Sequence, residues 1–107
     1  MEKYTVIYSP EAMDDLRSIY SYIAFKLKEP DIAKKLVDKI RNDIRKLDEQ
    51  PERYAPVEWE PWKSMGMRKL QIGNYVVLYL TDNGQKKVSI TRIFYGGRNI
   101  EKIISEQ

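Results

Sequence analysis

The chemistry open to this chain is limited by two residue types that it lacks. The sequence contains no histidine and no cysteine. This excludes an imidazole general base, a Ser-His-Asp triad, a thiolate nucleophile, disulfide bonds and zinc sites built on these side chains. An enzyme of this composition must move protons with lysine, tyrosine, aspartate or glutamate, and stabilise charge with arginine, lysine or backbone amides. We expect no cofactor and no bound metal.

Basic residues gather in the C-terminal half of the chain, although the net charge is only +3. Between positions 67 and 98, Asp82 is the only acidic residue, and the basic residues are Arg68, Lys69, Lys86, Lys87, Arg92 and Arg98. Such a segment favours an anionic partner. Ordinary solvated charges on the surface of a sheet explain it equally well.

The sequence also predicts where the protein is located. No apolar run approaches the roughly 20 residues that a membrane span needs. The N-terminal residues mix polar and apolar side chains and lack the apolar segment of a signal peptide. We therefore expect a cytoplasmic protein.

The first half of the chain predicts a strand and two helices. Positions 3–8 have the composition of a strand, and Ser9-Pro10 is typical of a helix start, with serine as N-cap. Apolar residues then follow at helical spacing as far as Leu27, and a second helix is predicted from Asp31 to about Asp48. The short break at Pro30 makes the two helices an antiparallel hairpin.

The second half predicts a long connection followed by three strands. Positions 51–66 contain three prolines, and we expect Trp59 and Trp62 there to cover the edge of the core. Alternating patterns predict strands at 67–72, 75–81 and 87–95, joined by tight turns into an antiparallel meander. Beyond the last strand, the chain continues as a short apolar tail with Ile100, Ile103 and Ile104.

This order of elements, βααβββ, predicts a single α+β domain over residues 1–107. The apolar faces of these elements can be buried together in an antiparallel sheet with the helical hairpin packed on one face. Lys69 should lie on the opposite, solvent-facing side. Strict alternation would also bury Arg92, which requires either a β-bulge or a carboxylate partner at the core edge. The residues expected to face the helices are Val6, Leu70, Ile72, Val77, Tyr79, Val88 and Ile90.

Four short motifs occur in a fixed order along the chain. The first helix carries A-x-x-D-L-x-x-I-x-x-Y at 12–22, and the second ends with I-x-x-L-x-x-x-P at 44–51. The predicted hairpin carries R-x-L-x-x-G-x-Y at 68–75, and the last strand ends with R-I-F-Y-G-G-R-N at 92–99. In order and spacing, these motifs resemble the RelE/ParE superfamily of bacterial type II toxins. The resemblance covers nearly the whole chain.

The resemblance implies a growth-inhibiting toxin, neutralised by a small, partly disordered antitoxin that folds around it. ParE-type members inhibit DNA gyrase by binding it, whereas RelE-type members cleave mRNA on the ribosome without a metal ion. The first-helix motif and Arg92 favour the ParE branch. For that branch we expect target-binding residues at Arg68, Lys69, Arg92 and Arg98.

The RelE branch is the alternative, with Lys69, Arg98 and Tyr95 as catalytic residues. The resemblance matches Lys69 and Arg98 to a lysine and an arginine of the RelE site. Met67 replaces a second lysine there, Val76 replaces an arginine, and the C-terminal tyrosine has no counterpart. The loss of one general acid or base typically costs ~10²–10⁴ in rate. Whether the chain is an enzyme stays open at this point.

Other readings remain for these residues. In a non-catalytic nucleic-acid-binding module, Tyr75, Tyr79, Tyr95 and Phe94 would stack on bases beside the basic strands. Arg98 has a structural alternative, an ion pair with a carboxylate such as Asp15. A metal-dependent nuclease is a weaker reading, because acids near a helix start usually face solvent. Its candidate ligands are Asp14, Asp15 and Asp38.

Overall fold

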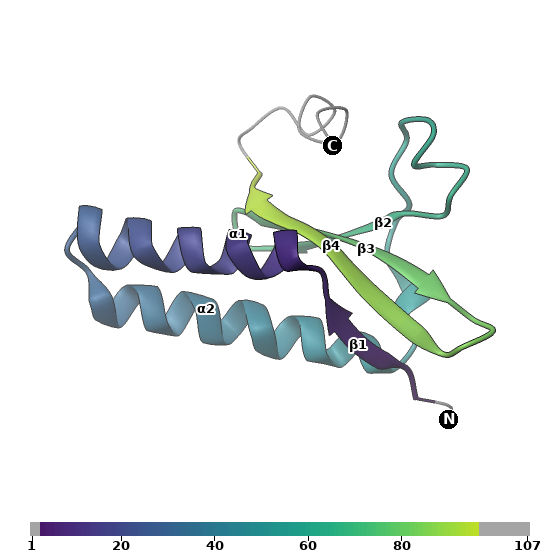
Figure 1. The fold of residues 1–107 in the computed structure, drawn as a ribbon, viewed down its shortest axis with the longest axis horizontal. Helices are drawn as coiled ribbons and strands as arrows, with labels where there is room; N and C mark the ends of the chain where they lie inside the picture. The colour runs from purple at the N-terminus through teal and green to yellow at the C-terminus, as the bar shows by residue number, and fades with distance from the viewer. Residues whose placement is uncertain (1–2, 97–107) are drawn as a thin grey trace.

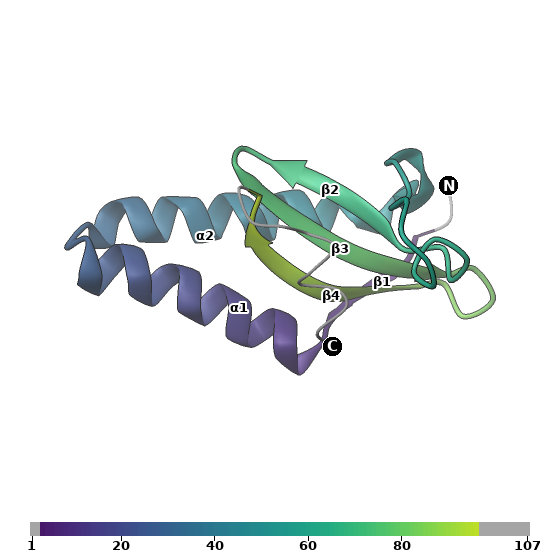
Figure 2. The same ribbon diagram turned by 90° about the horizontal axis from the view of Figure 1, so that it is seen from above.

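The chain folds as a four-stranded sheet with two helices on one face (Figures 1 and 2). The computed structural model describes residues 3–96. The predicted α+β order is confirmed. The elements are β1 (Thr5–Tyr8), α1 (Pro10–Ser21), α2 (Pro30–Arg45), β2 (Arg68–Ile72), β3 (Tyr75–Asp82) and β4 (Lys87–Tyr95).

The sheet is mixed, where the sequence predicts a fully antiparallel one. Strands β2, β3 and β4 form the expected antiparallel meander, and the sheet order is β1-β4-β3-β2. Strand β1 runs parallel to β4, with Val6 opposite Val88. Parallel neighbours need a long crossover connection. Here the connection from β1 to β4 runs through the helical hairpin, the segment that follows it, and strands β2 and β3.

Helix α1 begins as the sequence predicts. The Ser9 hydroxyl oxygen accepts a hydrogen bond from the Ala12 N–H at 3.0 Å, and Pro10 occupies the first helical position. The same hydroxyl donates to the Thr91 carbonyl oxygen at 2.9 Å. This N-cap therefore also ties the start of α1 to strand β4.

The end of the first helix differs from the prediction. A π-helical turn, Tyr22–Lys26, follows α1, and its wider hydrogen bonding shifts the helix face by about one residue. Ile23 and Ala24 are the buried residues of this turn. Leu27, expected on the apolar face, is 51% exposed.

Helix α2 starts at Pro30, one residue earlier than the sequence predicts. Proline has no N–H group, and the first helical position does not need one, so Pro30 begins the helix. The regular helix ends at Arg45, and a 3₁₀ turn, Lys46–Asp48, continues to the predicted end. Within residues 3–96, no helix is long and apolar enough to cross a membrane.

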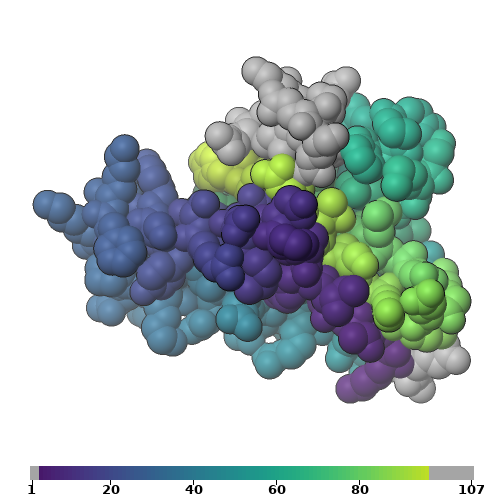
Figure 3. Space-filling view, viewed as in Figure 1, coloured from purple at the N-terminus to yellow at the C-terminus, as the bar shows by residue number. Residues whose placement is uncertain are grey.

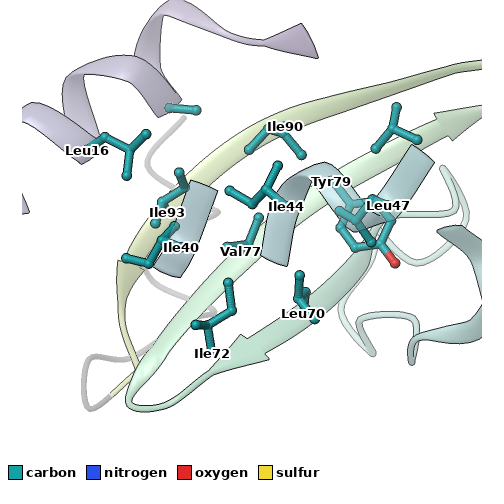
Figure 4. Close-up of a cluster of buried hydrophobic side chains, with 12 residues drawn as sticks. Leu16, Ile40, Ile44, Leu47, Leu70, Ile72, Val77, Tyr79, Ile90 and Ile93 are labelled. Atoms are coloured by element: carbon teal, nitrogen blue, oxygen red, sulfur yellow. The ribbon is translucent and has the colours of Figure 1, made fainter. Parts of the chain in front are cut away.

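The main core lies between the sheet and the helices, as Figure 4 shows. All but one of the strand residues predicted to face the helices are at most 6% exposed, and Val6 is partly buried. Full burial of an aliphatic side chain contributes about 1.5–3 kcal/mol. The helical side of this core is formed by Ala12, Leu16, Ile40, Ile44 and Leu47.

The other face of the sheet carries a second apolar cluster, where the sequence predicts a solvent-facing surface. Trp59 and Trp62 pack against this cluster, as expected for the connection between α2 and β2. The connection also covers the edge of β2, because the Lys69 N–H donates to the Ala55 carbonyl oxygen at 3.0 Å. The second apolar cluster consists of Val57, Met67, Val76, Leu78 and Phe94.

The helical hairpin extends past the sheet to one side of the molecule (Figure 3). Ile23, Ala24 and Ala33 form a small buried cluster that holds its two helices together. Several large apolar residues near the tip are nevertheless exposed, which makes the tip a potential contact surface. They are Tyr22, Phe25, Leu27 and Ile32.

Candidate functional site

An ion pair joins α1 to the last residues of β4. Strand β1 ends at Tyr8, opposite Ile90, so beyond that point α1 takes its place beside β4. One oxygen of the Asp15 carboxylate accepts hydrogen bonds from Arg92 Nε at 2.7 Å and from the Ile93 N–H at 2.9 Å. The other accepts from Arg92 Nη2 at 3.2 Å. The Asp15 carboxylate thus satisfies a backbone N–H on the side of β4 that β1 no longer covers.

A β-bulge in β4 changes the alternation that would otherwise bury the Arg92 side chain in the core. Leu78 pairs with Arg92 while Tyr79 pairs with Ile90, which leaves Thr91 as an extra residue in β4. The bulge brings Ile93 back into the main core. Arg92 therefore has both of the expected features, a bulge beside it and a carboxylate partner. Its side chain is 23% exposed, and the hydrogen bond to Asp15 raises the pKa of the guanidinium.

The connection before β2 is held by Arg68. Its Nη1 donates to the Tyr54 carbonyl oxygen at 2.6 Å, and its Nη2 lies 3.8 Å from a Glu52 carboxylate oxygen. The guanidinium is mostly buried, with 24% of the side chain exposed. Both Arg68 and Arg92 are therefore engaged in contacts that hold the fold together.

Lys69 and Tyr95 lie on opposite faces of the sheet. Lys69 alternates with Leu70 of the main core, so it lies on the face of the second apolar cluster. Tyr95 is two residues beyond Ile93 of the main core, so it lies on the same face, the helix face. The structure does not bring these two predicted catalytic residues together. The third, Arg98, lies outside the described residues.

Two positions of the RelE-type pattern are filled by buried apolar side chains. Met67 is 1% exposed and Val76 is 3% exposed, and both belong to the second apolar cluster. The resemblance to RelE-type toxins would place a lysine and an arginine at these positions. In this chain the positions contribute to packing, and no cation is present there.

Tyr95 lines a cleft at the end of β4. Its ring meets that of Tyr75 edge to face, with 5.6 Å between the ring centroids, and its side chain is 51% exposed. Tyr22, from the π-helical turn, completes an aromatic border. The cleft has a volume of about 620 Å³. Sequence reasoning missed this grouping, because the π-helical turn that positions Tyr22 has no clear sequence signal.

The start of the chain after β4 is fixed beside this cleft. The Gly96 N–H donates to the Asn74 carbonyl oxygen at 2.6 Å, in the turn between β2 and β3. A Cβ atom on residue 96 would lie 3.1 Å from that oxygen and 3.2 Å from a methyl carbon of Val76. A side chain is therefore tightly restricted at this position, which suits glycine.

A groove runs between β1 and α2. Its lining includes Val6 and Tyr8 from β1 and Arg41 and Arg45 from α2, and its volume is about 520 Å³. Burial raises the pKa of the Tyr8 hydroxyl above its ordinary value, and the nearby Arg41 guanidinium opposes that rise. Since β1 is an edge strand, this groove lies at the side of the sheet.

The geometry does not favour the two other hypotheses from the sequence, a base-stacking nucleic-acid-binding module and a metal-dependent nuclease. Tyr79 is fully buried and its hydroxyl donates to the Pro51 carbonyl oxygen at 2.5 Å, so it cannot stack on a base. Asp14 and Asp38 form ion pairs with Arg17 and Lys34 on their own helices. Residues 3–96 contain no cluster of three or more acidic side chains that could hold a metal ion.

Comparisons with known proteins agree with the motif pattern. Residues 6–100 match the family model described as the ParE toxin of the type II toxin–antitoxin system parDE. A search of curated proteins found no match.

Solved structures share this fold. A chain of the chromosomal ParDE system of P. aeruginosa has a TM-score of 0.71 at 23% identity, covering 87% of this chain and 96% of that one. The RelBE2 toxin–antitoxin complex of Mycobacterium tuberculosis gives a TM-score of 0.60 at 26% identity, covering 87% of this chain and 98% of that one. A mutant of the E. coli toxin RelE in the free state gives a TM-score of 0.63 at 13% identity, covering 97% of this chain and 93% of that one. Since the family model spans most of the sequence, this chain belongs to the ParE toxin family of type II toxin–antitoxin systems.

Proposed function

We propose that this ParE-family toxin arrests growth in the cytoplasm by binding and inhibiting DNA gyrase, without a chemical step of its own. The observation that carries the proposal is the burial of Met67 and Val76 beneath the tryptophans of the connection. An RNA-cleaving site needs cations to stabilise the developing charge, and the RelE-type pattern has a lysine and an arginine at these two positions. Inhibition by binding needs only a complementary surface, which fits what this chain retains.

The four residues expected at the target interface divide into two kinds. Arg68 and Arg92 are engaged in internal contacts with Tyr54 and Asp15, so they support the surface from within. Lys69 is half-buried beside the second apolar cluster, and Arg98 follows the fixed end of β4. We propose that Lys69 and Arg98 contact the target directly.

Replacing Arg98 with alanine should weaken growth inhibition by about 10- to 30-fold, measured as the inducer concentration needed for arrest. This is the effect expected when a charged side chain central to an interface is truncated. The melting temperature should stay unchanged. Lys102→Ala is the matched control, because it removes the same charge from the same tail. Full toxicity in a well-folded Arg98→Ala protein would contradict the role of Arg98.

Pulse labelling after induction distinguishes gyrase from the ribosome as target. If the toxin inhibits gyrase, thymidine incorporation should fall first, while leucine incorporation continues for some time. Immediate loss of leucine incorporation, with mRNA cleaved on ribosomes, would instead support the RelE-type alternative.

We also propose that the cognate antitoxin uses the groove between β1 and α2. The outer edge of β1 has no strand partner among the described residues, and an extended segment can add to such an edge. Arg41 and Arg45 lie one helical turn apart in the groove lining, where they can pair with carboxylates of that segment. The ordering of a disordered segment on this surface suits an antitoxin of the expected kind.

The double variant Arg41→Glu with Arg45→Glu should weaken antitoxin binding by about 10- to 100-fold, because reversed charges repel the proposed carboxylates. Titration calorimetry at two salt concentrations measures the change, and the salt dependence should decrease with it. Lys26→Glu with Lys35→Glu is the control, since it reverses the same number of charges outside the groove. Equal affinity of both double variants would exclude this groove as the antitoxin site.

A further inference from the structure

The cleft between α1 and the end of β4 has the character of an apolar docking site. Ile19 and Tyr22 line it on the helical side, and Tyr75, Ile93 and Tyr95 line it from the sheet. The two charged side chains in its lining, Asp15 and Arg92, neutralise each other through their ion pair. Its volume of about 620 Å³ is in the range of sites that hold a ligand or several side chains. The cleft therefore favours an uncharged, aliphatic occupant.

We propose that this cleft is occupied by the C-terminal segment of the same chain, residues 97–107, through Ile100, Ile103 and Ile104. Tyr95 lines the cleft, and the Gly96 hydrogen bond to Asn74 fixes the point where the chain leaves β4. Figure 1 shows this end of β4 next to α1. The eleven residues that follow start at the border of the cleft, so their local concentration there is high.

The length and composition of the segment fit the cleft. Ile100 is five residues beyond Tyr95, a reach of at most ~18 Å, and the Gly96-Gly97 pair allows the chain to turn back. The three isoleucines are the only large apolar residues in positions 97–107. Their removal from water supplies the driving force for docking.

Docking has a consequence for Arg98. The residue lies between Gly97 and the isoleucines, so a seated tail holds its side chain close to the end of β4. Only the use of Arg98 at this place to contact the target rests on the proposed function. Docking of the tail does not depend on the identity of the target, and its test is structural.

The absence of native cysteine allows a direct cross-linking test on the full chain. Ser18→Cys places a thiol in the lining of the cleft, and a second cysteine replaces Glu101, Lys102 or Ser105 in turn. Disulfides require Cα atoms about 4.4–6.8 Å apart. Under dilute, mildly oxidising conditions, at least one pair should form an intramolecular disulfide at least tenfold faster than its Arg17→Cys counterpart.

Arg17 is the matched control because it is exposed and lies nearly opposite the cleft-lining residues of α1. Equal rates for Ser18→Cys and Arg17→Cys with all three tail cysteines would overturn the proposal. Disulfide-linked dimers in place of the internal bond would assign the cleft to a second copy, which also overturns it.

A stability measurement provides an independent test. Replacing the three isoleucines with serine should lower the melting temperature by several degrees, because the cleft loses its apolar occupant. The control replaces Glu101, Lys102 and Glu106 with serine and should leave the melting temperature within about one degree. An unchanged melting temperature in the isoleucine variant would contradict docking of the tail, whatever the toxin inhibits.

Discussion

Replacing Asp15 with alanine should lower the free energy of unfolding by about 2–3 kcal/mol. Removal of one partner from a fully buried ion pair costs about 3–5 kcal/mol, because the other charge is left without compensation. The Asp15 and Arg92 side chains are 17% and 23% exposed, so solvent reduces that cost. The substitution also leaves the Ile93 N–H without its acceptor. Urea denaturation followed by circular dichroism measures the change.

Asp14, the residue directly before Asp15, provides the control for this substitution. Its carboxylate binds Arg17 Nη1 at 2.8 Å, but both side chains are at least 70% exposed. Exposed pairs of this kind contribute about 0–1 kcal/mol, so Asp14→Ala should change stability by less than about 0.5 kcal/mol. If Asp15→Ala is no more destabilising than Asp14→Ala, the ion pair with Arg92 does not anchor the end of β4.

Replacing Val76 with arginine should destabilise the protein by about 3–5 kcal/mol. This substitution restores the residue type that the RelE-type pattern has at the position. Val76 is 3% exposed inside the second apolar cluster, where a guanidinium has no partner and loses its hydration. Thermal and urea unfolding should both show the loss, and the variant should gain no ribosome-dependent RNA cleavage.

Gln71→Arg is the control for that substitution. Gln71 lies directly opposite Val76 in the β2–β3 pair, but it is exposed. Arginine at position 71 should shift stability by no more than about 0.5 kcal/mol. A well-folded Val76→Arg protein that cleaves mRNA would show that this face can hold a nuclease site, against the proposed binding mechanism.

The order of elements and most of the core follow from local sequence patterns. The Ser9-Pro10 helix start, the two C-terminal turns and the alternation in β2 and β3 depend on neighbouring residues, so the chain specifies them locally. The orientation of β1 relative to β4 depends on contacts between residues about 80 positions apart. Local periodicity carries no information on such pairings, which is why the mixed sheet was not predicted.

The site was less predictable than the fold. The sequence indicates that Arg92 needs a bulge or a carboxylate, yet Asp15 becomes its partner only when α1 replaces β1 beside β4. The π-helical turn that positions Tyr22 depends on packing between the two helices. The burial of Met67 and Val76 likewise requires the tryptophan-bearing connection to cover the sheet. Each of these features arises from tertiary contacts that no local pattern contains.

A gyrase supercoiling assay tests the central claim most directly. Relaxed plasmid, purified gyrase and ATP are incubated with increasing amounts of the toxin, beside a mock purification and the Arg98→Ala protein. The account predicts a dose-dependent loss of supercoiling with accumulation of linear plasmid, weaker for Arg98→Ala and absent from the mock sample. Undiminished supercoiling, by a preparation that still arrests growth when expressed, would contradict gyrase inhibition.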